Sequence, residues 1–257
     1  MTAPAIVLCG GRATRLAERW GDRPKALVPV AGRPFIEWQL EWLARGGVRR
    51  VHLAAGHLGS MLADWARRWS PSGPAATLAG ALSWSVEPTP LGTGGGARFA
   101  AGHVDGDPVF VVNGDSLLPG LADFQSLENA IGRASKAWTP LRTADVSTDT
   151  AGVWAVMGVT QVADAARFGT VELDGEVVTG FLEKGRASSG WINGGVYLLR
   201  RAALEAIPAG QPSSLETDHF PLWAEDRRIA AVRVPPPLHD MGTPAGLAEL
   251  ERALGEG

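Results

Sequence analysis

Apolar residues recur with two different periods along the first half of the chain. Short continuous apolar runs, typical of strands covered on both faces, occupy Ala5–Cys9, Val48–Ala54, Leu82–Val86 and Pro108–Val112. Between these runs, apolar positions recur at helical spacing over Phe35–Arg45, Leu58–Trp69 and Gly94–Ala101. Strands that alternate with helices predict an α/β chain with a doubly wound, mostly parallel sheet.

The second half of the chain has a more mixed pattern. Strand-like runs cover Val153–Thr160 and Gly194–Leu199, and Pro244–Leu254 has helical spacing. Between them we expect a hairpin within residues 169–178, with Asp174-Gly175 as its two-residue turn. The chain is therefore expected to form one domain over residues 1–257, built on a mixed, Rossmann-like sheet whose second half is partly antiparallel.

The segment Ser126–Thr150 differs from its surroundings. It begins with a predicted helix over Leu127–Lys136 and continues as a polar stretch, "TPLRTADVSTDT". A loop of this length inside a compact domain usually has a function. We expect a lid or an oligomer contact here.

Composition excludes several classes of protein. The chain has 257 residues, with 24 basic and 27 acidic side chains and a net charge of −3, so nucleic acid is not expected as a partner. The single cysteine, Cys9, excludes an internal disulfide framework and a cysteine-based zinc cluster. No apolar run reaches the ~20 residues of a membrane span, and the first run is too short for a signal peptide. These features predict a cytoplasmic protein without a membrane partner.

Two glycines and two arginines follow the first predicted strand, in "VLCGGRATRL". Glycine allows backbone N–H groups to approach an anion closely, and Arg15 can bind a phosphate with two hydrogen bonds. A plain tight turn is an equally good interpretation of Gly10-Gly11 alone. The pattern is neither a dinucleotide-binding fingerprint nor a Walker A loop. Lys25 follows Pro24, which fixes the chain before it, although an ordinary solvated lysine is the alternative.

Two aspartates are candidate ligands for a hard cation such as Mg²⁺. Asp115 directly follows an apolar strand in "VFVVNGDS", where a carboxylate points into the crevice of a doubly wound sheet. The alternative is an Asx turn that ends the strand. Asp240 lies far along the chain in "LHDMGTP", where it could instead lead into the last helix. Thr243 is better placed as the cap of that helix.

Seven blocks in a fixed order carry a resemblance to a known family. They are "LCGGRATRL", "RPKALVPVAGRPF", "EPTPLGTGGGAR", "VVNGDS", "FLEKG", "GWINGGVYLL" and "HDMGTP". Over nearly its whole length the chain resembles the sugar-1-phosphate nucleotidylyltransferases, and it is most similar to the short heptose-1-phosphate guanylyltransferase branch. Ala13 departs from the family pattern, which usually has glycine there.

The resemblance implies that the chain binds a nucleoside triphosphate in its first half, residues 1–118, and a sugar 1-phosphate in its second half, residues 119–257. It implies catalytic roles for Arg15, Lys25 and Asp115, and a Mg²⁺ ion on Asp115 and Asp240. The nucleotide would contact Leu8, Gly10, Gly11, Arg12, Thr14, Arg15, Glu87, Gly92, Thr93, Asn113 and Gly114. The sugar phosphate would contact Glu183, Lys184, Trp191, Asn193 and Gly194.

The resemblance places Glu87 beside the base. Guanine offers two adjacent donors on its pairing edge, and an ionised carboxylate accepts both, so Glu87 favours GTP. A solvated loop glutamate is the alternative. Three further readings stay open: the same reaction with mannose or glucose 1-phosphate or another base, a catalytically silent regulatory subunit that binds nucleotide sugars, and a glycosyltransferase. The oligomeric state is also open, with a homodimer as one option.

Overall fold

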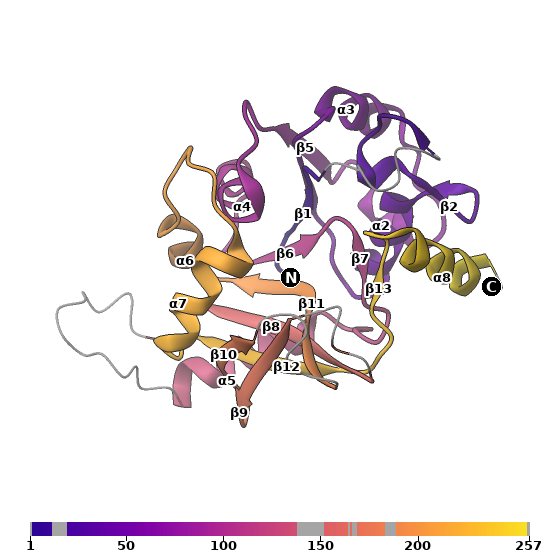
Figure 1. The fold of residues 1–257 in the computed structure, drawn as a ribbon. Coiled ribbons are helices and arrows are strands. Elements are labelled where there is room, and N and C mark those ends of the chain that lie inside the picture. The colour runs from indigo at the N-terminus through magenta and orange to yellow at the C-terminus, as the bar shows by residue number, and fades with distance from the viewer. Residues whose placement is uncertain are drawn as a thin grey trace.

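The computed structural model describes residues 2–11, 20–137, 152–163, 165, 169–182 and 189–255. Its centre is one mixed sheet of nine strands in the order β5-β4-β1-β6-β11-β8-β12-β10-β9 (Figure 1). The first four strands in that order are β5 (Leu82–Val86), β4 (Val51–Ala55), β1 (Ala5–Cys9) and β6 (Val109–Asn113), and they run parallel. The predicted doubly wound half is therefore confirmed.

The remaining five strands form the mixed half of the sheet. They are β11 (Gly190–Leu199), β8 (Ala155–Val162), β12 (Ile229–Val234), β10 (Val177–Leu182) and β9 (Thr170–Asp174). β11 joins the halves because it pairs antiparallel with both β6 and β8, whereas β12 runs parallel to β8. The predicted antiparallel portion is present, and β12 is a strand that the hydrophobic pattern did not predict.

Helices cover both faces of this sheet. On one face lie α2 (Phe35–Arg45), α3 (Gly59–Arg68) and α5 (Gln125–Ala137), and α8 (Pro244–Gly255) joins the same core cluster at the edge of the molecule. On the other face lie α4 (Gly92–Ala101), α6 (Arg201–Glu205) and α7 (Phe220–Glu225). Along β1, Val7 packs in the core on the α2 face of the sheet, and its neighbour Ile6 packs in the core on the α4 face. Because both faces are covered, the strand is an uninterrupted apolar run.

Short elements complete the fold. They are the 3₁₀ turns η2 (Lys25–Leu27) and η3 (Gly73–Leu78), the π-helical turn η4 (Leu215–His219), the pair β2 (Pro29–Val30) and β3 (Arg33–Pro34), and the pair β7 (Ser116–Leu117) and β13 (His239–Asp240). None of these was predicted, since each is too short to show a hydrophobic period.

Some predicted boundaries were wrong. β4 begins at Val51, because Val48 still donates a backbone hydrogen bond to Leu43 O at the end of α2. The β9–β10 turn consists of Gly175 and Glu176, since Asp174 pairs with Val177; the predicted turn is shifted by one residue. Gly175 takes the positive φ of +64° that this tight turn needs.

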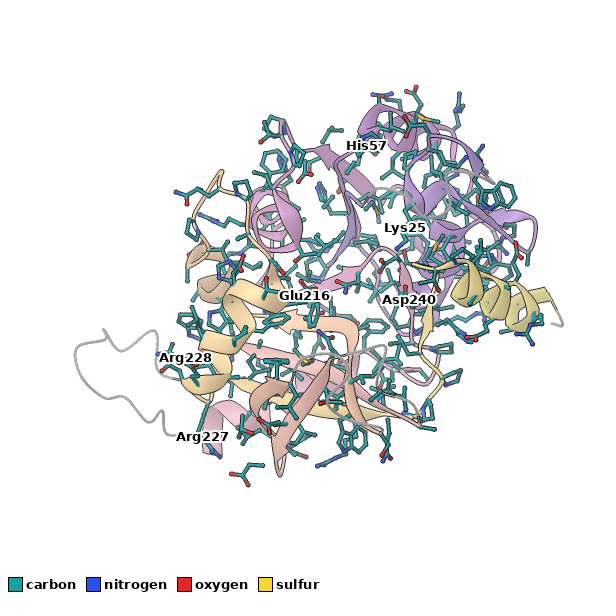
Figure 2. The ribbon with its side chains drawn as sticks, in the orientation of Figure 1. Lys25, His57, Glu216, Arg227, Arg228 and Asp240 are labelled. Atoms are coloured by element: carbon teal, nitrogen blue, oxygen red, sulfur yellow. The ribbon has the colours of Figure 1, made fainter. Side chains whose placement is uncertain are left out.

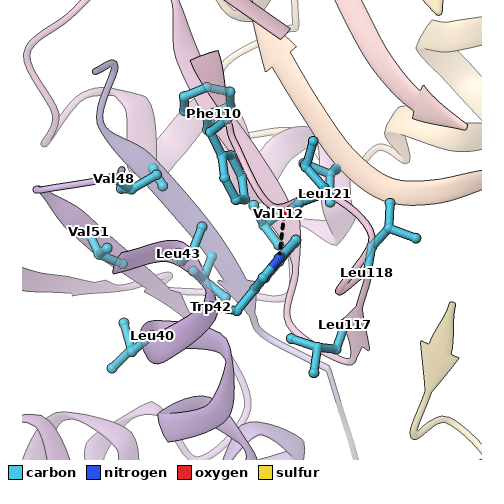
Figure 3. Packing of buried hydrophobic residues seen from close by; sticks show 14 of the residues in the cluster. Leu40, Trp42, Leu43, Val48, Val51, Phe110, Val112, Leu117, Leu118 and Leu121 are labelled. Carbon is cyan, nitrogen blue, oxygen red and sulfur yellow. Dashed lines mark hydrogen bonds between the residues drawn. The ribbon is translucent and has the colours of Figure 1, made fainter. Parts of the chain in front are cut away.

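Tryptophan side chains build part of the core. Trp42 is 8% exposed, stacks edge-on against Phe124 with 5.0 Å between ring centroids, and donates its indole N–H to Leu121 O at 2.9 Å (Figure 3). Leu40 and Leu43 fill the space beside it. Helix α2 is thereby fixed against the segment that follows β7.

Helix α5 occupies the first half of the Ser126–Thr150 segment. Leu127, Ala130 and Ile131 are buried, and the helix packs on β12 and β8. This half is part of the domain core, so it is not a lid. Residues 138–151, which hold the rest of that segment, lie outside the described residues.

Over the part of the chain that the structure describes, no helix is both long enough and apolar enough to cross a bilayer.

Candidate active site

Two neighbouring cavities open above the carboxyl ends of the parallel strands. The first has a volume of about 300 Å³ and is bounded by residues that include Gly10, Lys25, Glu87 and Thr93. The second, of about 860 Å³, lies toward β11 and is bounded by residues that include Asn193, Glu216 and Asp240. Asn113 and Asp115 line both cavities, so a ligand in one cavity meets a ligand in the other at the end of β6.

Glycines let the chain segments around the first cavity come close together. The Gly114 amide donates to Leu8 O at 3.1 Å, and a side chain on Gly114 would overlap that carbonyl oxygen. Leu8, Gly10 and Gly11 also line this cavity, together with Gly92 and Thr93 from the start of α4. The predicted nucleotide residues in the described part of the chain are therefore gathered around one cavity.

Glu87 lies against the glycines of the first cavity. A methyl group on Gly10 would be 3.3 Å from Glu87 Oε1, and one on Gly96 would be 3.5 Å from Oε2. Burial raises the pKa of the Glu87 carboxyl, and a hydrogen bond from the Leu91 backbone partly opposes that rise. Glu87 is thus a half-buried acceptor in the cavity rather than a solvated loop residue.

Lys25 and Asp115 form an ion pair at the junction of the cavities. Lys25 Nζ lies 2.6 Å from Asp115 Oδ2, and the side chains are 14% and 36% exposed. The Ser116 hydroxyl donates to Asp115 Oδ1 at 3.1 Å. The buried Gln39 side-chain amide fixes the turn that carries Asp115, because it donates to Asn113 O and Ser116 O at 2.8 Å each.

Asp240 reaches the same place from the far end of the chain. β13 pairs with β7, which sets Asp240 opposite Ser116, and the Met241 amide donates to Asp115 O at 3.0 Å. The Gly242 amide donates to Asp240 Oδ1 at 2.7 Å, and a methyl group on Gly242 would lie 3.2 Å from Lys25 Nζ. Figure 2 shows Lys25 and Asp240 near each other.

The alternative, in which Asp240 leads into the last helix, is not supported by the structure. Thr243 caps α8, because its side-chain oxygen accepts from the Gly246 amide at 3.1 Å. Asp115, which directly precedes β7, and Asp240, in β13, together give two carboxylates. Within the described ranges, no group of three or more histidine, cysteine, aspartate or glutamate side chains is arranged to hold a metal ion.

The second cavity contains only part of the predicted sugar-phosphate set. Asn193 lines it, as does Gly195, whereas neither Gly194 nor Trp191 is among the described residues that bound it. Gly194 is packed between strands, since a methyl group there would lie 2.8 Å from Gly158 O. The Arg233 guanidinium lies over the Trp191 ring, 5.4 Å from the ring centroid.

Other predicted residues lie outside the described part of the chain. They are Arg12, Thr14, Arg15, Glu183 and Lys184, together with the departure at Ala13. Their roles stay predictions.

Sequence reasoning missed Glu216. It lies on η4 and lines the second cavity, and its Oε2 accepts a 2.6 Å hydrogen bond from the Thr93 hydroxyl of the first cavity. The only available signal was the acidic "SLETDHF" stretch, which follows no strand.

Residues 5–213 match the model of the MobA-like NTP transferase domain. The chain belongs to this family. It is therefore a nucleotidyltransferase, and the resemblance and the Rossmann-like α/β class predicted from its sequence are confirmed.

Named relatives of this family member act on sugar phosphates. The chain is 31% identical to mannose-1-phosphate guanylyltransferase of Mycobacterium tuberculosis over 97% of its own length and 65% of the relative's. It is 30% identical to D-glycero-alpha-D-manno-heptose 1-phosphate guanylyltransferase of Campylobacter jejuni, over 77% of its own length and 76% of the relative's. The chain thus spans just under two thirds of the first relative and three quarters of the second.

A solved structure shows the same fold. HddC from Yersinia pseudotuberculosis, complexed with GMP-PN, aligns with a TM-score of 0.78 at 24% identity, covering 98% of this chain and 100% of that one.

Proposed function

We propose that the chain transfers GMP from GTP to a heptose 1-phosphate, with release of pyrophosphate. One observation carries the proposal: the two cavities share Asn113 and Asp115, and Lys25 is ion-paired to Asp115 at that shared edge. A nucleotide in the first cavity and a sugar phosphate in the second would bring their phosphates together there. Residues 1–118 and 119–257 then serve as the nucleotide and sugar-phosphate halves.

The chemistry needs charge stabilisation more than proton transfer. An oxygen of the sugar phosphate attacks the α-phosphorus in line, the bond from that phosphorus to the bridging oxygen breaks, and pyrophosphate leaves. The nucleophile is already an anion, so no general base is required. Lys25 stabilises the charge that builds on the α-phosphoryl group, and Arg15 holds the leaving phosphates. Positioning and electrostatics supply most of the rate in such reactions.

The donor set at the junction fits Mg²⁺. Asp115 and Asp240 offer carboxylate oxygens, which are the ligands that hard cations prefer. The Gly242 amide bonds to Asp240 Oδ1, so Oδ2 keeps its acceptor capacity. Asp115 and Asp240 would hold the Mg²⁺ ion, which would supply positive charge to neutralise the phosphates. Two carboxylates alone are few ligands for the ion, and phosphate oxygens and water would complete the set.

Glu87 is the basis for proposing GTP. An ionised carboxylate accepts from N1–H and from the exocyclic amine of guanine, whereas adenine and cytosine present a ring-nitrogen acceptor at that edge. The names of both relatives, which are guanylyltransferases, support the same base.

The identity of the sugar is proposed from the names of the relatives rather than from the residues that line the second cavity. The heptose enzyme of Campylobacter jejuni is matched over most of its length, and this favours heptose 1-phosphate. Mannose 1-phosphate is the second candidate, because the mannose enzyme is matched over 97% of this chain. Both proposed substrates are water-soluble metabolites, so we place the reaction in the cytoplasm, without a membrane or nucleic-acid partner.

The test is pyrophosphate release with Mg²⁺, measured across ATP, GTP, CTP, UTP and dTTP, each paired with heptose, mannose and glucose 1-phosphates. Turnover with GTP and a heptose 1-phosphate, abolished by Lys25→Ala, would support the proposal. Turnover with a different pair would keep the reaction and change the base or the sugar. Binding of nucleotide sugars without turnover of any pair would favour a regulatory subunit.

A further inference from the structure

The segment Gln211–His219 belongs to the second half of the chain but packs beside the first cavity, where the proposed nucleotide binds. It lies so close to the start of α4 that a methyl group on Gly92 would be 2.5 Å from Ser213 O, and one on Gly94 would be 2.6 Å from Ser213 Oγ. The Gly94 amide donates to Ser213 O at 2.8 Å, and the Ser213 amide donates to Leu91 O at 2.9 Å. The start of α4 is therefore bonded to this segment through both backbones.

Glu216 and Thr93 add a side-chain connection to that contact. The Thr93 hydroxyl donates to Glu216 Oε2 at 2.6 Å, and Thr93 Oγ1 accepts from the Leu215 amide at 2.9 Å. The Ser214 hydroxyl also donates to Oε2, at 3.0 Å. The Thr93 hydroxyl thus donates one hydrogen bond to this segment and accepts another from it, which fixes the Thr93 rotamer.

The other carboxylate oxygen of Glu216 belongs to the second cavity. The Tyr197 hydroxyl donates to Oε1 at 3.4 Å, a long contact that leaves Oε1 with most of its acceptor capacity. The Asn193 side chain donates to Tyr197 Oη at 2.8 Å, and its own oxygen accepts from the Gly195 amide. Glu216 and Asn193 both line the cavity, and Figure 2 shows Glu216 near the centre of the molecule.

An acceptor of this kind selects among the groups of a sugar phosphate. A carboxylate repels the phosphate and accepts hydrogen bonds from hydroxyl groups. We propose that Glu216 recognises a hydroxyl group of the sugar 1-phosphate through Oε1 and, through Oε2 and Thr93, couples that recognition to the nucleotide cavity. This rests on the proposed function, and it assigns Glu216 to sugar specificity and Thr93 to positioning.

The coupling has a thermodynamic consequence. A sugar hydroxyl bonded to Oε1 holds Glu216 in the position in which Oε2 accepts from Thr93, so each substrate raises the affinity for the other by the same factor. We expect a factor of about five or more, the usual lower range for coupled sites.

The experiment measures binding by calorimetry, with a GTP analogue that carries a methylene group between the α- and β-phosphorus atoms. Each of mannose, heptose and glucose 1-phosphate is titrated into the full chain with Mg²⁺, with and without the analogue. The variants are Glu216→Gln, Thr93→Val, which keeps the shape but not the hydroxyl, and Thr93→Ser, which keeps the hydroxyl. Asp218→Asn is the matched control, because it removes a charge from the same turn without lining either cavity.

Glu216→Gln is expected to weaken sugar-phosphate binding by about tenfold, the scale of a lost charged acceptor, and to remove the coupling. Thr93→Val is expected to keep the affinity for the sugar phosphate alone and to lose the coupling, which Thr93→Ser restores. Asp218→Asn is expected to behave as the wild type.

Three results distinguish a failure of this inference from a failure of the proposed function. If the wild type binds a sugar 1-phosphate and Glu216→Gln leaves both affinity and coupling within twofold, the inference is wrong and the proposed function stands. If Thr93→Val keeps the coupling, the link through Thr93 is wrong. If the wild type binds none of the sugar 1-phosphates, the proposed function fails and this inference fails with it.

Discussion

Lys25 Nζ and Asp115 Oδ2 lie 2.6 Å apart at the edge that the two cavities share. The chain positions these residues, 90 apart in sequence, by separate means: the η2 turn after Pro24 for the lysine, and the end of β6, held by Gln39, for the aspartate. The pair therefore places one positive and one negative side chain at the point where the two cavities meet. The arrangement is therefore suited to exchange with a phosphate and a cation, the charges that the proposed substrates bring.

Replacing Lys25 with alanine is expected to lower kcat by about 10³-fold, the loss typical of a single group that stabilises transition-state charge. Stability is expected to change little, because Asp115 is 36% exposed and water can solvate its carboxylate. Pyrophosphate release and thermal unfolding measure the two effects. A variant that keeps kcat within tenfold would show that Lys25 does not face the reacting phosphate.

Removing either aspartate is expected to weaken the response to Mg²⁺. Asp115→Asn and Asp240→Asn each delete one carboxylate from the pair, and we expect the Mg²⁺ concentration for half-maximal activity to rise about tenfold or more, since hard cations prefer charged oxygen ligands. Calorimetric titration of Mg²⁺ into the nucleotide-bound protein provides a readout that does not depend on turnover.

The control for these variants is Asp64→Asn, which removes an exposed carboxylate that pairs with Arg67 on α3. It is expected to leave the Mg²⁺ dependence unchanged. An unchanged dependence in Asp240→Asn as well would mean that Asp115 binds the metal without it.

The parallel half of the fold and the residues at its strand ends followed from the hydrophobic pattern. Buried strands give continuous apolar runs, and in a doubly wound sheet Gly10 and Asp115 must follow such strands at the same edge. β12 and the β7–β13 pair were not predicted. The first is a short run, "IAAVRV", whose period does not separate a strand from a helix, and the second has only two residues in each strand. Glu216 was missed because its importance depends on contact with Thr93, which is 123 residues away. A contact between residues so far apart leaves no local pattern in the sequence.

Glu87→Gln is expected to lower kcat/KM for GTP by at least tenfold, while KM for the sugar phosphate stays within twofold. The amide presents a donor where guanine also donates, and it leaves one of the two donors unpaired. The same variant is expected to unfold at a higher temperature at pH 7. Burial raises the pKa of Glu87, so the folded state binds a proton more tightly than the unfolded state does, and ionisation above that pKa costs stability.

Glutamine removes this cost, and the gain is expected to vanish as the pH falls below the ordinary glutamate pKa. Glu205→Gln, on the exposed side of α6, is the control that is expected to alter neither property. Equal losses with GTP and ATP would indicate a role in holding the loop rather than in reading the base.

Stability is expected to fall on acidification because of His52, which lies on β4 away from both cavities. The ring is 2% exposed, its two nitrogens bond to Ser83 Oγ and Ser85 Oγ at 2.8 Å each, and it stacks on His103 at 5.6 Å. Burial, and secondarily His103, lowers the pKa of His52 from 6.5 to about 4. Between these values the unfolded chain binds a proton that the folded chain does not, so stability is lost as the pH falls through that window.

The shift corresponds to about 3 kcal/mol between pH 7 and pH 4, at about 1.4 kcal/mol for each pKa unit. Urea unfolding of the wild type and of His52→Gln at several pH values measures it. His52→Gln is expected to be less stable at pH 7, because it disturbs a packed strand, but to lose less stability on acidification. His57→Gln, which removes a histidine beside Asp22 near the surface, is expected to keep the wild-type slope. If His52→Gln and the wild type lose stability in parallel, another buried group causes the acid sensitivity.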